Sequence, residues 1–234
     1  MSERPGGRES EPGPSGRGSG RERVDSPSGP AGGQEREATT ARYDASTALL
    51  VVDVQNDFAD PDGSLYVRDA ESVIDVTNTE IEAARSAGAM VVYTQDWHPP
   101  VTPHFAKDGG IWPVHCVHGT WGAELHPRLT VVNGERIRVG VGGEDGYSGF
   151  TVADPVTGDT ERTALDDLLR QRGVERVVVL GLATDYCVRA TALDAVTLGY
   201  DTTLVVDGVQ PVEMEPGDGQ RAIDEMSAAG VTLA

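Results

Sequence analysis

The chain has 234 residues, of which 24% are charged and 38% hydrophobic, and its formal net charge is −19. This length allows one large α/β domain or two small ones. The strong negative charge argues against a nucleic-acid partner, because a phosphate backbone is bound by clustered Lys and Arg.

The first part of the chain is predicted to be a disordered tail. From Met1 to about Arg42 it contains no aromatic residue, and Val24 is its only large aliphatic residue. It therefore cannot bury enough apolar surface to offset the entropy of ordering. It also lacks the apolar core of a secretory signal, and it is too acidic for a transit peptide. We expect a tail over 1–43, one domain over 44–234, and a cytoplasmic protein.

Neither a membrane span nor a disulfide framework is expected. No run approaches the roughly 18 apolar residues that a span needs. The two cysteines, Cys116 and Cys187, lie in different motifs, which fits a reduced compartment. The sequence leaves open whether the chain forms a homo-oligomer.

From Thr47 onward, short aliphatic runs alternate with amphipathic stretches. This alternation predicts an α/β fold in which helices cover both faces of a parallel sheet. In chain order the predicted elements are strand 49–52, helix 72–87, strand 90–93, a helix through 165–169, strand 177–180, a helix through 188–196, strand 204–206, a helix through 222–226 and strand 231–233.

The segment 97–133 interrupts the alternation. It is long, rich in Pro, Gly, His and Trp, and has no clear periodicity. Loops of this length inside a compact domain are usually functional.

Three chemically able side chains follow predicted strands. Asp53 ends the first strand, Asp96 ends the second, and Cys187 lies in the turn after the strand around Val179. Ligands bind beyond the carboxyl ends of the strands in an open α/β sheet, so these residues should converge. The start of a helix should lower the pKa of Cys187 and make it a nucleophile. The alternative for an isolated cysteine is a buried structural role, which we assign to Cys116.

Asp53 is a candidate for the base that takes the thiol proton. A carboxylate at a strand end near other acids can have a raised pKa. The alternative is a turn or cap residue, which is the commoner role of an Asp that follows a strand.

Asp96, His98, His104 and His115 lie close together in the sequence and predict a site for Zn²⁺, Mn²⁺ or Fe²⁺. The alternative is a set of solvated histidines, since the spacing matches no zinc-finger pattern. The other histidines, which we expect at the surface, are His118 and His126. Phe58, Trp112 and Tyr147 could stack on a flat ring, with core packing as the alternative.

Together these residues resemble the isochorismatase-like cysteine hydrolases of the nicotinamidase type, over about 48–233. The motifs that carry the resemblance are Asp53-Val-Gln-Asn-Asp-Phe58, Asp96-Trp-His98, His104-Phe105, Trp112-Pro-Val-His115-Cys116, Tyr147-Ser-Gly-Phe150 and Gly181-Leu-Ala-Thr-Asp185-Tyr-Cys187-Val. The resemblance implies a three-layer sandwich and a small amide as substrate. The residues it implies as catalytic are Asp53 and Cys187, and its implied ligands for a divalent metal are Asp96, His98 and His115, with His104 in some members.

The resemblance also implies a cis peptide between Leu182 and Ala183. The backbone N–H groups of Ala183 and Cys187 would then form an oxyanion hole for a thioester reaction that releases ammonia. Phe58 and Trp112 would sandwich the substrate ring.

One position departs from the family pattern. The family's third catalytic residue is a Lys in a Lys-Gly pair, and the matching pair here is Val139-Gly140, while the only lysine is Lys107. A valine there removes a buried cation and should raise the pKa of the thiol. Arg138 could replace the cation only through a slipped register or a bulge. Tyr186, where many nicotinamidases carry His, is a milder departure.

Three functions are consistent with these observations. The first is an amidase that acts on nicotinamide. The second is a hydrolase of another small amide or ureido compound, because one fold hosts several substrates. The third is a protein that binds a metal and a ligand without turnover, which the residue Val139 would favour.

Overall fold

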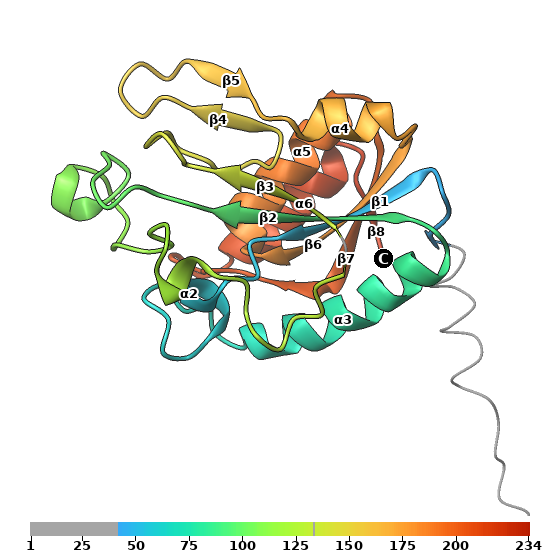
Figure 1. Ribbon diagram of the computed structural model, residues 1–234, viewed down its shortest axis with the longest axis horizontal. Helices are drawn as coiled ribbons and strands as arrows, with labels where there is room; N and C mark the ends of the chain where they lie inside the picture. Colours follow the sequence, from blue (N-terminus) through green and yellow to red (C-terminus); the bar gives the residue numbers. More distant parts are fainter. Residues whose placement is uncertain (1–41, 133) are drawn as a thin grey trace, which may run out of the picture.

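The computed structural model describes residues 42–132 and 134–234 (Figure 1). The predicted tail, apart from its last two residues, lies outside this range. Those two residues belong to the folded part of the chain. The phenol of Tyr43 donates a hydrogen bond of 2.6 Å to Glu80, and Arg42 forms an ion pair of 2.9 Å with the same carboxylate.

A six-stranded sheet forms the centre of the domain, in the order β3-β2-β1-β6-β7-β8, and every pairing in it is parallel. The strands are β1 (Thr47–Val52), β2 (Met90–Asp96), β3 (Glu135–Val139), β6 (Arg176–Leu182), β7 (Asp201–Gln210) and β8 (Thr232–Leu233). Each strand predicted from an aliphatic run is confirmed. The structure adds β3, whose alternating exposed and buried residues give no continuous apolar run.

Helices cover both faces of this sheet, which confirms the predicted three layers. The helix α3 (Ala70–Ser86) packs on one face against β1, β2, β6 and β7. The opposite face is covered by α4 (Leu165–Gln171), α5 (Arg189–Thr197) and α6 (Asp218–Ala228) (Figure 1). No helix in the described ranges is long and apolar enough to cross a membrane.

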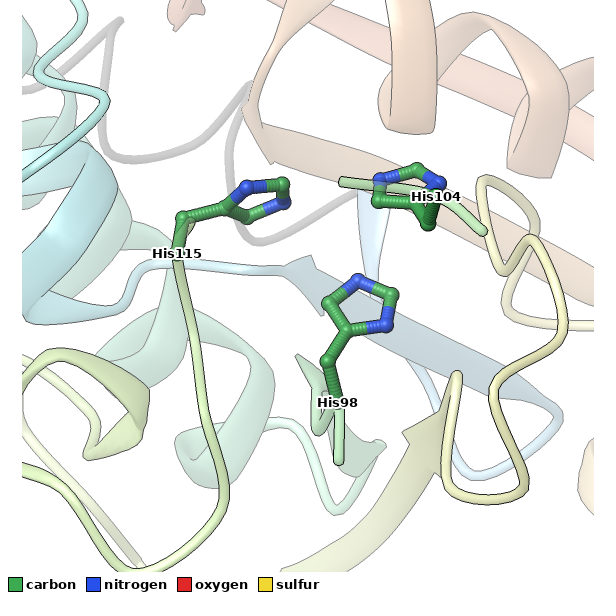
Figure 2. A group of neighbouring side chains, drawn as sticks. All are labelled: His98, His104 and His115. Carbon is green, nitrogen blue, oxygen red and sulfur yellow. The ribbon is translucent and has the colours of Figure 1, made fainter. Parts of the chain in front are cut away.

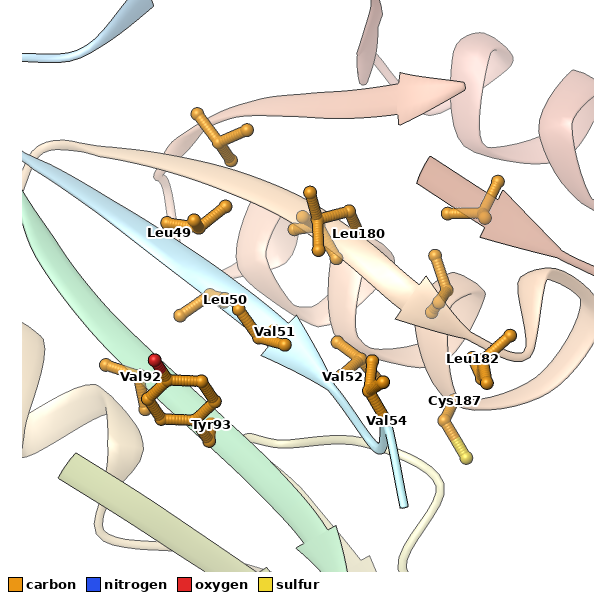
Figure 3. Close-up of a cluster of buried hydrophobic side chains, with 14 of the residues drawn as sticks. Leu49, Leu50, Val51, Val52, Val54, Val92, Tyr93, Leu180, Leu182 and Cys187 are labelled. Carbon is orange, nitrogen blue, oxygen red and sulfur yellow. The ribbon is translucent and has the colours of Figure 1, made fainter. Parts of the chain in front are cut away.

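The central strands are buried on both faces. All six residues of β1 are buried. Figure 3 shows the side chains of Leu49–Val52 among those of β2 and β6. Removing apolar surface from water stabilises a fold by roughly 25 cal/mol per Å². Burial on both faces is therefore a main source of stability for the sheet. The carboxyl ends of these strands are therefore a rigid base for a site.

Two parts of the chain lie outside the main sheet. The segment 97–132 contains only two short 3₁₀ turns, η1 (Ala106–Asp108) and η2 (Trp121–Ala123), as the lack of periodicity predicts. The strands β4 (Thr151–Ala153) and β5 (Thr160–Arg162) form an antiparallel hairpin that the sequence did not predict. Its residues are partly or fully exposed, so no apolar alternation marks it.

Candidate active site

Asp53 and Cys187 lie where the order of the strands reverses. β1 and β6 are neighbours, and the chain extends the sheet from β1 through β2 to β3 and from β6 through β7 to β8. Asp53 directly follows β1, and Cys187 lies in the π-helical turn η3 (Thr184–Val188) after β6. Figure 3 shows Cys187 beyond the ends of both strands. Ligands bind at such a switch point in open α/β sheets, so the predicted convergence is confirmed.

Asp53 is held by Thr94 of β2. The backbone φ of Asp53 is 48°, in the left-handed region that few residues other than glycine adopt. Its Oδ1 accepts a hydrogen bond of 2.5 Å from the Thr94 hydroxyl. The backbone N–H of Asp53 donates to that hydroxyl oxygen, Oγ1 of Thr94, at 3.2 Å. Burial, followed by the charge of Asp96, raises the pKa of Asp53 to about 7. A carboxyl group with this pKa can accept and return a proton near neutral pH.

The thiol of Cys187 is buried near Asp53, close enough for the carboxyl group to affect its pKa, and Oδ2 of Asp53 has no hydrogen-bond partner among the described residues. Burial, together with the negative charges of Asp53 and Asp96, raises the pKa of Cys187 well above its usual value. The expectation that the start of a helix lowers this pKa is therefore wrong, because desolvation and two nearby carboxylates outweigh the helix dipole. The thiol needs a base to become nucleophilic, and Asp53 is the nearby carboxyl group whose pKa lies close to neutral.

The peptide bond between Leu182 and Ala183 is cis, as the resemblance implies. Ala183 and Cys187 line the same cavity. The carbonyl of Ala183 accepts hydrogen bonds from the N–H groups of Tyr186 and Val188, each at 3.1 Å, which fixes the turn that carries the thiol. An oxyanion hole formed by Ala183 and Cys187 stays a prediction.

Three histidines of the long loop face one another in Figure 2. His98, His104 and His115 are all buried, and one ligand nitrogen from each lies within 4.8 Å of the other two. The carboxylate oxygen Oδ2 of Asp96 is 3.5 Å from Nε2 of His98 and 3.5 Å from Nε2 of His115. The four predicted ligands therefore form one cluster, called the histidine cluster below, beside Asp53.

The donor atoms of this cluster fit a divalent metal. Nδ1 of His115 donates to the carbonyl of Pro113 at 2.7 Å, which leaves Nε2 as an acceptor. Both ring nitrogens of His98 are buried and have no hydrogen-bond partner among the described residues. A buried polar atom without a partner is costly, and coordination would satisfy it.

Glycine is required beside His98. Gly140 has a φ of 75°, and a Cβ at this position would lie 2.5 Å from Nδ1 of His98. The backbone after β3 therefore approaches the imidazole more closely than a residue with a side chain allows.

The contacts of Asp96 within the cluster shift the pKa values of Asp96 and His98 toward their charged forms. Burial alone would raise the pKa of Asp96, but contacts with His115 and His98 hold it well below its usual value. Burial alone would lower the pKa of His98, yet the contact with Asp96 raises it. Asp96 is therefore ionised at neutral pH, as a metal ligand must be.

A small cavity opens between the histidine cluster and Cys187. The indole N–H of Trp112 donates to the hydroxyl of Tyr147 at 2.7 Å, and the ring of Trp112 meets that of Tyr186 edge-on at 4.8 Å. These aromatic rings and Phe58 make a narrow wall that suits a flat ring. The residues that line the cavity are Phe58, Leu65, Asp96, His104, Trp112, His115, Tyr147, Ala183, Tyr186, Cys187 and Val212.

The position to which the resemblance assigns the family lysine holds a buried valine, Val139. Val139 is paired with Asp96 and Arg138 with Gln95 in the regular register between β3 and β2. Adjacent residues of a strand point to opposite faces, so Arg138 is exposed while Val139 is buried. The Arg138 side chain does not replace the lysine.

Sequence reasoning missed three residues that hold the site. Thr94 binds Asp53, and its position two residues before Asp96 in a strand could have revealed it. The side-chain amide of Gln55 donates to the carbonyl of Asp96 at 2.7 Å and accepts from the N–H of Asp96 at 2.8 Å. Asp145 binds His104, and no sequence signal marks it.

One of the two histidines predicted at the surface is buried. His126 is 5% exposed, because its N–H pairs with the carbonyl of Val54 and its ring accepts a hydrogen bond from the backbone of Arg128. That prediction is wrong, whereas His118 is exposed as expected.

Known proteins share this arrangement of sequence and fold. The family model described as "Isochorismatase domain" matches residues 47–234. A nicotinamidase of Escherichia coli is 40% identical over 208 residues, which cover 80% of this chain and 93% of that protein. A nicotinamidase/pyrazinamidase of Mycobacterium tuberculosis is 38% identical over 189 residues and covers 80% and 97% of the two chains.

Solved structures agree. The pyrazinamidase of Pyrococcus horikoshii in complex with zinc superposes with a TM-score of 0.73 at 38% identity, over 81% of this chain and 98% of that one. PnC1 of L. infantum in complex with nicotinate has the same TM-score at 36% identity, over 81% and 92% of the two chains. With a family match over most of its length, the chain belongs to the isochorismatase family.

Proposed function

We propose that this protein is a nicotinamidase, which hydrolyses nicotinamide to nicotinate and ammonia. The observation that carries the proposal is the convergence of Asp53 and the Cys187 thiol at the ends of β1 and β6, at one side of an aromatic cavity whose other side is lined by the histidine cluster. Nicotinamidases from several organisms, at 37–40% identity for two of them, support the same activity.

The reaction begins with a proton transfer. Asp53 takes the proton of Cys187, so that one negative charge moves within the pair and none is added to the buried site. The thiolate attacks the amide carbon, and the N–H groups of Ala183 and Cys187 stabilise the negative oxygen. Asp53 gives its proton to the amide nitrogen, the C–N bond breaks, and ammonia leaves a thioester on Cys187.

Water completes the cycle. Asp53 accepts a proton from the attacking water, the thioester C–S bond breaks, and nicotinate leaves while Cys187 recovers its proton. Phe58 and Trp112 hold the flat ring between them, which keeps the carboxamide beside the thiol.

A divalent cation belongs to this site. Asp96, His98, His104 and His115 would hold it, with the imidazole and carboxylate donors that suit zinc, manganese or iron. The bound zinc of the pyrazinamidase from Pyrococcus horikoshii supports this assignment. Such an ion would supply Lewis-acid chemistry, which can polarise a substrate donor atom and lower the pKa of water.

A ureido substrate has weaker support. Ureidoacrylate amidohydrolases are also relatives, but the one from Caulobacter vibrioides is 31% identical over 69% of this chain. The buried Val139 favours slow turnover rather than another substrate, because it removes a positive charge near the nucleophile.

The test is ammonia release from nicotinamide by the full chain supplied with Zn²⁺, Mn²⁺ or Fe²⁺ in turn. Cys187→Ala is the blank, and ureidoacrylate is a parallel substrate. We expect release above the blank from nicotinamide and a lower kcat/KM with ureidoacrylate. Release from ureidoacrylate alone would transfer the proposal to that substrate class, and no release from either would refute an amidohydrolase.

A further inference from the structure

The β4–β5 hairpin fixes the backbone of Asp145 behind the histidine cluster. The N–H of Asp145 donates to the carbonyl of Ala153 at 2.7 Å, and the N–H of Ala153 donates back to Asp145 at 2.8 Å. Ala153 is the last residue of β4, and it also pairs with Thr160 of β5. Ala153 thus lies between Asp145 on one side and Thr160 on the other, so the loop residue Asp145 is hydrogen-bonded to the edge of the hairpin.

The side chain of Asp145 contacts His104. Oδ1 of Asp145 lies 2.6 Å from Nδ1 of His104, and the histidine side chain is 4% exposed while that of Asp145 is 30% exposed. An ionised carboxylate can only accept a hydrogen bond. Nδ1 of His104 therefore carries the hydrogen, and Nε2 is left as a lone-pair donor.

A second link joins the same two loops. The hydroxyl of Thr102 donates to the carbonyl of Gly143 at 2.8 Å and accepts the N–H of His104 at 3.2 Å. Thr102 is buried. The backbone of His104 and its ring are thus each tied to the segment that carries Asp145.

The other two histidines of the cluster are held differently. His115 donates its Nδ1 hydrogen to a backbone carbonyl, and His98 has no hydrogen-bond partner in the described part of the chain. Within that part, His104 is the cluster histidine whose outer nitrogen is bound by a carboxylate. Carboxylates in this position orient an imidazole and increase its strength as a ligand.

We propose that Asp145 is a positioning residue for the metal site, which fixes the ring of His104 with Nε2 toward the cation and raises its affinity. The inference rests on the proposed metal site. It also gives the β4–β5 hairpin a role, because the hairpin sets the position of the carboxylate.

The experiment measures the Zn²⁺ dissociation constant of the full chain by competition with a chromophoric chelator at a fixed pH. The variants are Asp145→Ala and Asp145→Asn, with Asp167→Ala as a control that removes an equal charge from an exposed position of α4. We expect Asp145→Ala to weaken binding by about 10- to 100-fold. Asp145→Asn keeps an acceptor oxygen but loses the charge, so we expect a smaller loss, and the control should match the wild type.

A second readout separates positioning from general structural damage. Long-range ¹H–¹⁵N spectra of the metal-free protein labelled at its five histidines report which ring nitrogen carries hydrogen, and His104→Gln assigns the signal. We expect His104 to be protonated at Nδ1 in the wild type and to lose this preference in Asp145→Ala. If Asp145→Ala fails to fold, Asp145→Asn decides by both measurements.

The outcomes distinguish this inference from the proposed metal site. Unchanged Zn²⁺ affinity in both folded Asp145 variants, with loss of binding in His98→Ala, would overturn the role of Asp145 and leave the metal site intact. Retained binding in His98→Ala would instead overturn the metal site itself.

Discussion

The guanidinium group of Arg138 lies over the ring of Trp97, with Cζ 3.8 Å from the ring centroid. Arg138 is the charged residue next to Val139 in β3. The contact with Trp97 keeps its side chain on the exposed face of the strand, whereas Val139 is buried. The cation that the resemblance implies at residue 139 is therefore not supplied by Arg138. The groups with the largest effects on the pKa of Asp53 in the described chain include no Lys or Arg.

Arg138→Ala and Val139→Lys should have different effects on amidase activity. Loss of an active-site group that stabilises charge typically costs about 10² to 10³ in rate. We expect Val139→Lys to recover up to that factor in kcat, and Arg138→Ala to stay within about twofold of the wild type.

Val139→Met is the control for the larger side chain, because it adds volume without charge. A large loss of activity in Arg138→Ala would show that this arginine acts in the reaction. Equal rates for the Lys and Met variants would show that charge at residue 139 has no effect.

Gly140→Ala should remove the metal. A Cβ at Gly140 would lie 2.5 Å from Nδ1 of His98, so the imidazole must move away from the cluster. Gly158→Ala is a matched control, since its φ of 76° is close to the 75° of Gly140 and no atom lies within 4 Å of the added carbon. Elemental analysis should find about one equivalent of metal in the control and much less in Gly140→Ala. Full metal content in both would contradict the assignment of His98 as a ligand.

Tyr43→Phe should destabilise the protein more than Tyr66→Phe. Both phenols donate to a glutamate, at 2.6 Å to Glu80 and 2.8 Å to Glu71. Glu80 is 6% exposed, so it cannot replace the lost donor with water as the more exposed Glu71 can. We expect a loss of about 1 to 3 kcal/mol for Tyr43→Phe and a smaller one for Tyr66→Phe, measured by urea unfolding.

The same assay tests the extent of the tail. Deletion of residues 1–41 should leave the free energy of unfolding unchanged, because the contacts with Glu80 start at Arg42. Deletion of residues 1–43 should cost at least as much as Tyr43→Phe. Destabilisation by the shorter deletion would show that earlier residues contribute to the fold.

The sheet and the convergence of the site could be predicted because they depend on local patterns. Continuous apolar runs mark strands that are buried on both faces, as in β1, and the parallel order then brings Asp53 and Cys187 to one edge. The pKa of Cys187 could not be predicted in the same way. It depends on the burial of the thiol and on its distance from two carboxylates that are remote in the sequence.

Long-range hydrogen bonds were equally hidden. Gln55 pairs with the backbone of Asp96, 41 residues away, and Asp145 reaches His104 across the same number of residues. Neither contact leaves a periodic trace. The hairpin that pairs with the backbone of Asp145 lacks apolar alternation because its strands do not face the core.

Asp53→Asn should stabilise the metal-free protein in a pH-dependent way while it abolishes amidase activity. Burial raises the pKa of Asp53 to about 7, whereas its ordinary value is 3.8. Between these values the folded protein binds a proton that the unfolded chain has lost, so the wild type loses stability as the pH rises from about 4 to 7. Asparagine keeps the shape and carries no charge, so the variant lacks this loss. The difference in pKa corresponds to at most about 4 kcal/mol.

Melting temperatures of chelator-treated protein should coincide for wild type and variant at pH 4 and diverge to a plateau above pH 7, with the variant higher. The exposed Asp167→Asn should show no such trend. A difference that is constant with pH would mean that Asp53 is ionised in the folded protein throughout, and that it cannot alternate between accepting and donating a proton in the proposed reaction.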